Sequence, residues 1–185
     1  IEEKEEVSIG ANTLQFYLAP MVHWPETMMT YMKEEKILFS ADAFGTFGTL
    51  DGGVVDSQLN PDKYWDEMIR YYSTIVGKFG SSVQTALKKL ESLEIEMICS
   101  THGPVWTLSE NVEKVLSLYD KLSKYEADEG LVIAYGSLYG NNEQVAEVIA
   151  AAAAESGVKN IVIHNTAKSD VSEILRDVFK YRGLV

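Results

Sequence analysis

Two histidines and one aspartate stand in equivalent places along the chain, each shortly after an apolar segment: His23, Asp42 and His102. If those segments are strands of an α/β sheet, the loops at their carboxyl ends gather at one rim, where rigid elements hold ligands. Neutral imidazole and carboxylate are ordinary ligands of Fe, Mn and Zn. The spacing therefore predicts a metal site. Two turn histidines bonded to the backbone and a loop carboxylate would give the same pattern, so both interpretations stay open.

Strands must bring these residues to the rim. The apolar segments that read as strands cover residues 14–18, 37–39 and 95–99. Pro20 stops the first strand, because proline cannot donate to the hydrogen-bond ladder, and a small-residue loop over 40–53 follows the second. The third strand runs into a turn over 101–104, which contains His102.

Helices are expected over residues 60–79, over 81–90 with Ser81 or Ser82 as the cap, and from residue 107 onward. Asn60 and Pro61 are an N-cap and a first-turn residue of the first helix. Thr107 and Glu110 have the spacing of a capping box at the start of the third.

The sequence pattern changes at about Asp128, after a polar stretch. The expected elements beyond it are strands over 131–135 and 158–163, helices over 142–155 and 171–181, and the approach to a third strand at 183–185. This alternation predicts right-handed βαβ units in a parallel sheet. We therefore predict an α/β protein with two domains, 1–127 and 128–185. The second is expected to be cut short, because two strands cannot bury both faces of such a sheet.

A glycine-rich loop over 135–142 connects the first strand and helix of the second domain. Backbone N–H groups at a helix N-terminus bind anions, and hydroxyl and amide side chains add donors. The loop is neither GxGxxG nor GxxxxGK[ST], which argues against a dinucleotide fingerprint and an NTPase loop. A phosphate site and an ordinary βα turn are the two interpretations.

The 185 residues contain 16 Lys and Arg against 28 Asp and Glu, so the formal charge of −12 disfavours nucleic acid and anionic membranes as partners. The single cysteine, Cys99, excludes an internal disulfide and indicates a reducing, cytoplasmic location. No apolar run approaches the roughly 18–20 residues of a membrane span. The opening at Ile1, without Met or a leader, indicates a piece of a longer protein. We expect His164 to be structural.

Three strings carry a resemblance to a known family: MVHWPETM at 21–28, SADAFG at 40–45 and STHGPVW at 100–106. In their order and spacing they resemble the flavodiiron proteins, or A-type flavoproteins, and the likeness extends over essentially the whole chain. On this resemblance the fold is the second half of a metallo-β-lactamase-like αββα domain followed by the first part of a flavodoxin-like domain.

The resemblance implies an oxidoreductase that reduces dioxygen to water, or nitric oxide to nitrous oxide. Electrons would pass through FMN to a non-haem site of two iron ions. Asp42 would correspond to the carboxylate that bridges both irons, with His23 on one iron and His102 on the other. The loop that resembles a flavodoxin phosphate loop would bind FMN through Ser137, Leu138, Tyr139, Gly140, Asn141 and Asn142. A rubredoxin-type electron donor and a head-to-tail homodimer are also implied.

The family takes its other metal ligands from an earlier H-x-E-x-D-H-type loop, which these residues lack. We therefore expect a complementing chain that carries the missing N-terminal segment, and no activity from the 185 residues alone. Two alternatives remain: a metal-dependent hydrolase of the metallo-β-lactamase superfamily, and a non-catalytic flavodoxin-like electron-transfer fragment.

Overall fold

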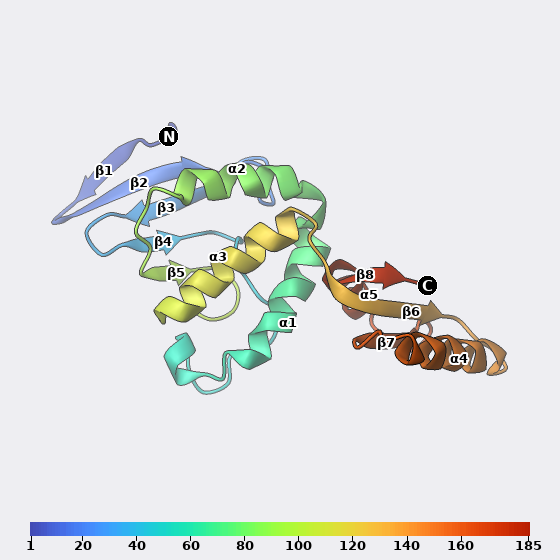
Figure 1. Cartoon of the computed structure of the whole chain (residues 1–185). Coiled ribbons are helices and arrows are strands. Elements are labelled where there is room, and N and C mark those ends of the chain that lie inside the picture. Colours follow the sequence, from blue (N-terminus) through green and yellow to red (C-terminus); the bar gives the residue numbers. More distant parts are fainter. The chain divides into compact units, whose positions relative to one another are not determined.

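The structure, a computed structural model, describes residues 1–185 and divides into two units, Ile1–Tyr125 and Glu126–Val185. Both combine strands and helices, which confirms the predicted α/β class (Figure 1).

The first unit is built on a five-stranded sheet in the order β1-β2-β3-β4-β5. Its strands are β1 (Glu6–Ile9), β2 (Asn12–Leu18), β3 (Met28–Met32), β4 (Ile37–Phe39) and β5 (Met97–Cys99). Neighbours from β1 to β4 run antiparallel, whereas β5 runs parallel to β4. The sequence predicted β2, β4 and a longer β5. It did not predict β1, whose four residues are all exposed, or β3, three of whose five residues are methionine.

Three helices belong to this unit: α1 (Asp62–Tyr71), α2 (Gly80–Leu90) and α3 (Ser109–Ser123). The prediction of one helix over 60–79 is wrong beyond Tyr71, where a π turn and a 3-10 turn follow. The hydroxyls of Ser73 and Thr74 donate to the carbonyl of Arg70, and such back-bonding competes with the helical pattern. Asn60 does cap α1, since its side chain accepts from the backbone N–H of Asp62.

The other two predicted caps are wrong. Helix α2 follows the 3-10 turn directly and has no side-chain cap, so neither Ser81 nor Ser82 fills that role. At the start of α3 the Thr107 side chain is a donor, and it bonds to the carboxylate of Asp56 at 2.7 Å. Asp56 is 1% exposed and also accepts from the backbone N–H groups of Thr107 and Leu108. A buried carboxylate from a distant loop therefore replaces the predicted capping box.

The two faces of the first sheet differ. One face lies under α2 and α3 (Figure 1) and carries the buried cross-strand row Tyr31, Leu38 and Ile98. The opposite face carries the row Leu14, Met32, Ile37 and Met97, all apolar and all only half-buried. Strand side chains alternate between faces, so apolar residues at successive positions make both faces apolar.

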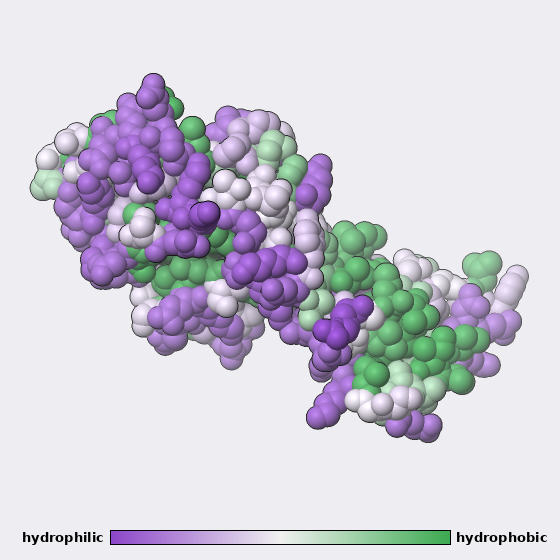
Figure 2. Space-filling model, turned by 45° about the horizontal axis from the view of Figure 1, so that its top comes forward, coloured by the Kyte–Doolittle hydropathy of each residue, from purple (hydrophilic) through white to green (hydrophobic).

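The second unit is a three-stranded parallel sheet in the order β7-β6-β8. Its elements are β6 (Asp128–Tyr135), α4 (Asn141–Glu155), β7 (Ile161–Asn165), α5 (Val171–Lys180) and β8 (Tyr181–Leu184). Strand β7 begins three residues later than the predicted 158–163 segment. Apolar residues gather on one face of this unit (Figure 2). On α4, Val145 and Val148 are 57% and 69% exposed.

Candidate metal centre

The parallel pairing of β4 and β5 places Asp42 beside His102. Leu38 faces Ile98 in the register, and the same sequence offset separates Asp42 from His102. Two backbone bonds continue the pairing past both strands, from Ser40 N to the Cys99 carbonyl at 3.0 Å and from Thr101 N to the Ala41 carbonyl at 2.9 Å. The two loops therefore leave the sheet side by side.

His23 comes from the loop between β2 and β3. The backbone N–H of Ala19 bonds to the Thr27 carbonyl at 2.8 Å, and that of Met21 bonds to the Trp24 carbonyl at 2.8 Å. Val22 is 1% exposed and anchors the loop in the core. The loop thus folds back on itself and projects His23 over the end of the sheet.

The three predicted ligands lie together. Asp42 Oδ2 is 3.1 Å from His23 Nε2, and Asp42 Oδ1 is 3.6 Å from His102 Nε2. Each oxygen of the carboxylate therefore faces a different imidazole. His23 and Asp42 are largely covered, at 22% and 25% side-chain exposure, whereas His102 is open at 55%.

Three of the six non-glycine residues with left-handed backbones lie in the loops that carry these residues. Met21, Ala41 and Phe44 have left-handed backbones, with φ of 66°, 52° and 65°. A residue with a side chain pays on the order of 1 kcal/mol for this conformation, so it persists only where the surroundings enforce it. Such positions cluster at functional sites, which supports a site at this rim.

Two further residues complete the surroundings. The Tyr71 ring, at the end of α1, lies 5.7 Å from the His102 ring between centroids, and burial together with the Asp42 charge raises the pKa of Tyr71. Thr101 Oγ1 donates to Asp42 Oδ1 at 2.5 Å. Sequence reasoning missed both. Tyr71 sits in an aromatic stripe that reads as helix packing, and the only signal for Thr101 is that it precedes His102.

A cavity of about 520 Å³ opens beside His23. Trp24 and Pro25 line one side, and residues of the π turn, including Thr74 and Ile75, line the other. Trp24 is 59% exposed and its ring lies 5.3 Å from that of His23. The cavity therefore has an aromatic wall next to a candidate ligand.

In the second unit the predicted phosphate loop lines a cavity of about 460 Å³. Five of the six residues predicted there contribute to it, together with Gly136 and Ala167: Ser137, Leu138, Tyr139, Asn141 and Asn142. Gly140 precedes α4 with φ of 83°, a conformation that suits glycine. Asn142 does not cap the helix, because it lies inside the first turn and its amide donates to the Gly136 carbonyl at 2.6 Å.

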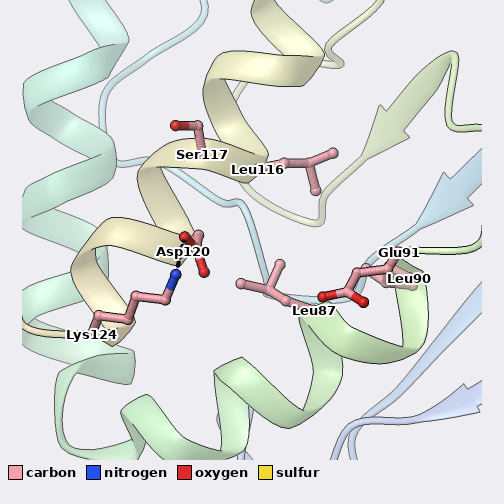
Figure 3. A pocket seen from close by; sticks show the side chains of 7 residues that line it. All are labelled: Leu87, Leu90, Glu91, Leu116, Ser117, Asp120 and Lys124. Carbon is pink, nitrogen blue, oxygen red and sulfur yellow. Dashed lines mark hydrogen bonds and ion pairs between the residues drawn. The ribbon is translucent and has the colours of Figure 1, made fainter.

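Another cavity, of about 370 Å³, lies between α2 and α3 and has no catalytic character (Figure 3). Its walls include Leu87 and Leu116. The one acidic group with a close partner there is Asp120, which pairs with Lys124 at 2.6 Å and accepts from Gln84 at 2.8 Å. This cavity therefore offers an apolar surface and no free titratable cluster.

Other groups named in the sequence have structural surroundings. His164 is 6% exposed and contacts Asp177 at 2.8 Å. Cys99 is half-buried, and burial raises the pKa of its thiol, which keeps it protonated. No group of three or more His, Cys, Asp or Glu side chains is arranged to hold a metal ion by itself. None of the helices has the length and apolar character needed to cross a membrane.

The sheet, its covering helices and the rim loops are those of a β-lactamase-like domain. Residues 1–103 match the family described as ODP family beta lactamase, and the chain belongs to this family. Its homologues over the whole chain are flavodiiron proteins.

Three of these relatives show the extent of the similarity. The anaerobic nitric oxide reductase flavorubredoxin of Escherichia coli O1:K1 is 32% identical, over 100% of this chain and 39% of its own length. The flavodiiron protein from Giardia intestinalis is 26% identical with a TM-score of 0.91, over 97% of this chain and 44% of that one. The rubredoxin oxygen:oxidoreductase of Desulfovibrio gigas shares the fold, with a TM-score of 0.92 at 23% identity, over 100% of this chain and 46% of that one. The chain thus spans less than half the length of each.

Proposed function

We propose that these residues form part of a flavodiiron oxidoreductase, which passes electrons through FMN to two iron ions and reduces dioxygen to water or nitric oxide to nitrous oxide. The observation that carries the proposal is the Asp42 carboxylate, which turns one oxygen toward His23 and the other toward His102. A carboxylate placed in this way can give one oxygen to each of two ions. The names of the relatives, a nitric oxide reductase and a rubredoxin oxygen:oxidoreductase, add support for the substrates.

The donor types, two imidazoles and one carboxylate, suit such ions, although the three side chains by themselves do not form a complete metal site. Metal–ligand bonds of about 2.0–2.2 Å place neighbouring donors of one ion roughly 3 Å apart. The separations of Asp42 from His23 and from His102, 3.1 and 3.6 Å, are close to that value. Since each ion would receive only two donors from these residues, we propose that its remaining ligands come from outside the 185 residues.

Bound iron would supply electrons to a diatomic molecule held at the rim. The residues around it have separate tasks. Asp42 brings negative charge between the two proposed iron positions. His23 and His102 offer neutral nitrogen lone pairs. Trp24 shields one side of the cavity beside His23. The Tyr71 ring packs beside the His102 ring, with 5.7 Å between the ring centroids.

For the second unit we propose the first part of a flavodoxin-like domain, with the loop 137–142 as the FMN phosphate site. The loop stands at the N-terminus of α4, where backbone N–H groups and the helix dipole favour an anion. Ser137 Oγ accepts from the Gly140 N–H at 3.0 Å, which leaves its own hydrogen available for a phosphate oxygen. Contacts to the flavin ring would come from residues outside this chain segment.

We also propose the partners. The half-buried apolar face of the first sheet supports a covering segment that carries the missing metal ligands, as a separate chain or as more of the same protein. A homo-oligomer and a rubredoxin-type electron donor follow from the family, and the name of one relative supports the donor. A cytoplasmic location agrees with the single cysteine.

Metal and flavin analysis of the purified protein, in the complex in which it occurs, tests the proposal. We expect the wild-type protein to contain iron together with FMN. We expect the Asp42→Asn variant to lose the iron. Dioxygen uptake and nitrous oxide formation with reduced rubredoxin would then establish the substrate. Zinc without flavin would favour the metallo-hydrolase, and the absence of both metal and flavin would leave a non-catalytic module.

A further inference from the structure

The carboxylate of Asp42 has a third polar contact besides the two imidazoles. Thr101 Oγ1 lies 2.5 Å from Asp42 Oδ1 and 3.2 Å from the Ala41 carbonyl oxygen. A hydroxyl has one hydrogen to donate. Hydrogen bonds to a charged acceptor are shorter and stronger than those to a neutral one, so the hydrogen goes to Asp42.

Thr101 is itself held in place. Its backbone N–H donates to the Ala41 carbonyl at 2.9 Å, which continues the β4/β5 pairing. Its branched side chain is restricted at χ1. The carboxylate of an aspartate, in contrast, rotates broadly about its last torsion. The fixed hydroxyl of Thr101 therefore selects one orientation of the otherwise mobile Asp42 carboxylate.

We propose that Thr101 is a positioning residue that orients Asp42 so that Oδ2 faces His23 and Oδ1 faces His102. This assignment rests on the proposed function, in which each oxygen serves a different ion. It adds an asymmetry, because the hydroxyl bond withdraws electron density only from Oδ1. The position beside His102 would therefore receive the weaker carboxylate donor, and the two metal positions would differ chemically although each would take one histidine and share the aspartate.

Three variants test the assignment. Thr101→Val and Thr101→Ala lack the hydroxyl, whereas Thr101→Ser keeps it. In crystal structures of the metal-free Val and Ala variants we expect the Asp42 carboxylate to rotate, so that its two oxygens no longer face His23 and His102. In the Ser variant we expect the carboxylate to keep the wild-type orientation. Unchanged Asp42 in both hydroxyl-free variants, or a Ser variant that behaves like them, overturns the proposal.

Titration with Co²⁺, followed by its visible absorption, gives a second measure in the full complex. Loss of an outer partner of a metal ligand weakens binding about 10–100-fold, which is the loss expected for Thr101→Val. Thr101→Ser should bind close to the wild type. The matched control is Thr85→Val, which removes a hydroxyl that donates to the Ser81 carbonyl on α2 and should change neither measurement. Wild-type affinity in Thr101→Val contradicts the assignment.

The two measurements separate this proposal from the one it rests on. A wild-type complex that takes up no Co²⁺ at the site counts against the proposed metal centre. The metal-free crystal structures still decide, in that case, whether Thr101 orients Asp42.

Discussion

Asp42 and His102 lie next to each other because they extend the parallel register of β4 and β5 by three residues beyond both strands. The position of one is therefore tied to that of the other by backbone hydrogen bonds and not only by side-chain contact. This relationship makes Asp42 the residue on which the candidate centre depends most.

Replacing Asp42 with Asn keeps the size of the side chain and removes its charge. We expect the affinity for iron, or for Co²⁺ as a probe, to fall at least about 100-fold, since even an outer partner is worth 10–100-fold. Metal analysis after dialysis measures the loss. Asp51→Asn is the control, because Asp51 is 80% exposed and its ion-pair partner is Lys63, not a histidine. Equal metal content in both variants would argue against Asp42 as a ligand.

Gly103 is required by the turn after His102. Its φ is 86°, and a Cβ atom there would stand 2.2 Å from Thr46 Oγ1. Gly103→Ala should lower the free energy of unfolding by at least about 2 kcal/mol, of which the left-handed backbone accounts for 1–2 kcal/mol. Urea denaturation measures this.

Gly52→Ala separates the cost of the left-handed backbone from the cost of the contact with Thr46. Gly52 has φ of 89° but open space around it. We expect the Gly52 variant to lose only the backbone part. If both variants lose the same amount, the contact with Thr46 is unimportant.

Asp56 makes the stability of the first unit depend on pH. Burial alone would raise the pKa of Asp56, but hydrogen bonds from Thr107, Asn111 and Leu108 hold it below its ordinary value of 3.8. Because the pKa of Asp56 is lower in the folded than in the unfolded state, its ionisation stabilises the fold at pH values above the unfolded-state pKa. This stabilisation is lost as the pH falls through the folded-state pKa. Unfolding measured across the range below about pH 5 should show this loss.

Asp56→Asn should cost about 1–3 kcal/mol at neutral pH, because it leaves buried donors without an acceptor, and should flatten the acid dependence. The control is again Asp51→Asn, which should change neither the stability nor its dependence on pH. An unaltered acid profile in the Asp56 variant would show that other carboxylates dominate.

The half-buried apolar face of the first sheet should cause association when nothing covers it. Phe39, on this side of β4, is 40% exposed. Sedimentation velocity of the 185-residue chain should therefore detect species larger than the monomer, and Phe39→Lys should reduce them. Leu50→Lys is the control, because Leu50 is 38% exposed but lies in a loop. A monodisperse wild-type monomer would contradict the expectation.

Several elements were predictable because their signals are local. Apolar runs stopped by proline or small residues predicted β2, β4 and β5. The strict alternation of strand patterns with helix patterns along the chain predicted the elements of the second unit. The same runs led to His23, Asp42 and His102, since each follows a strand end. The start of α1 was also predictable, because an N-cap acts over only a few residues.

The errors had different causes, and only one arose where a distant group replaced a local one. The cap of α3 comes from Asp56, more than fifty positions before the helix, and a capping box cannot be told from this arrangement by spacing. The end of α1 depends on hydroxyls that bond back to the helix. Strand β3 pairs on both sides and needs no alternation to be stable.

The sequence by itself determined the residue types that can bind a metal and the strands that carry them, because side-chain chemistry and hydrophobic patterning are local properties. Only the tertiary structure decided that Asp42 lies between His23 and His102 and that the Thr101 hydroxyl bonds to its carboxylate. These relations depend on strand register and on loops that meet across the sheet, and residues distant along the chain come together only when it is folded.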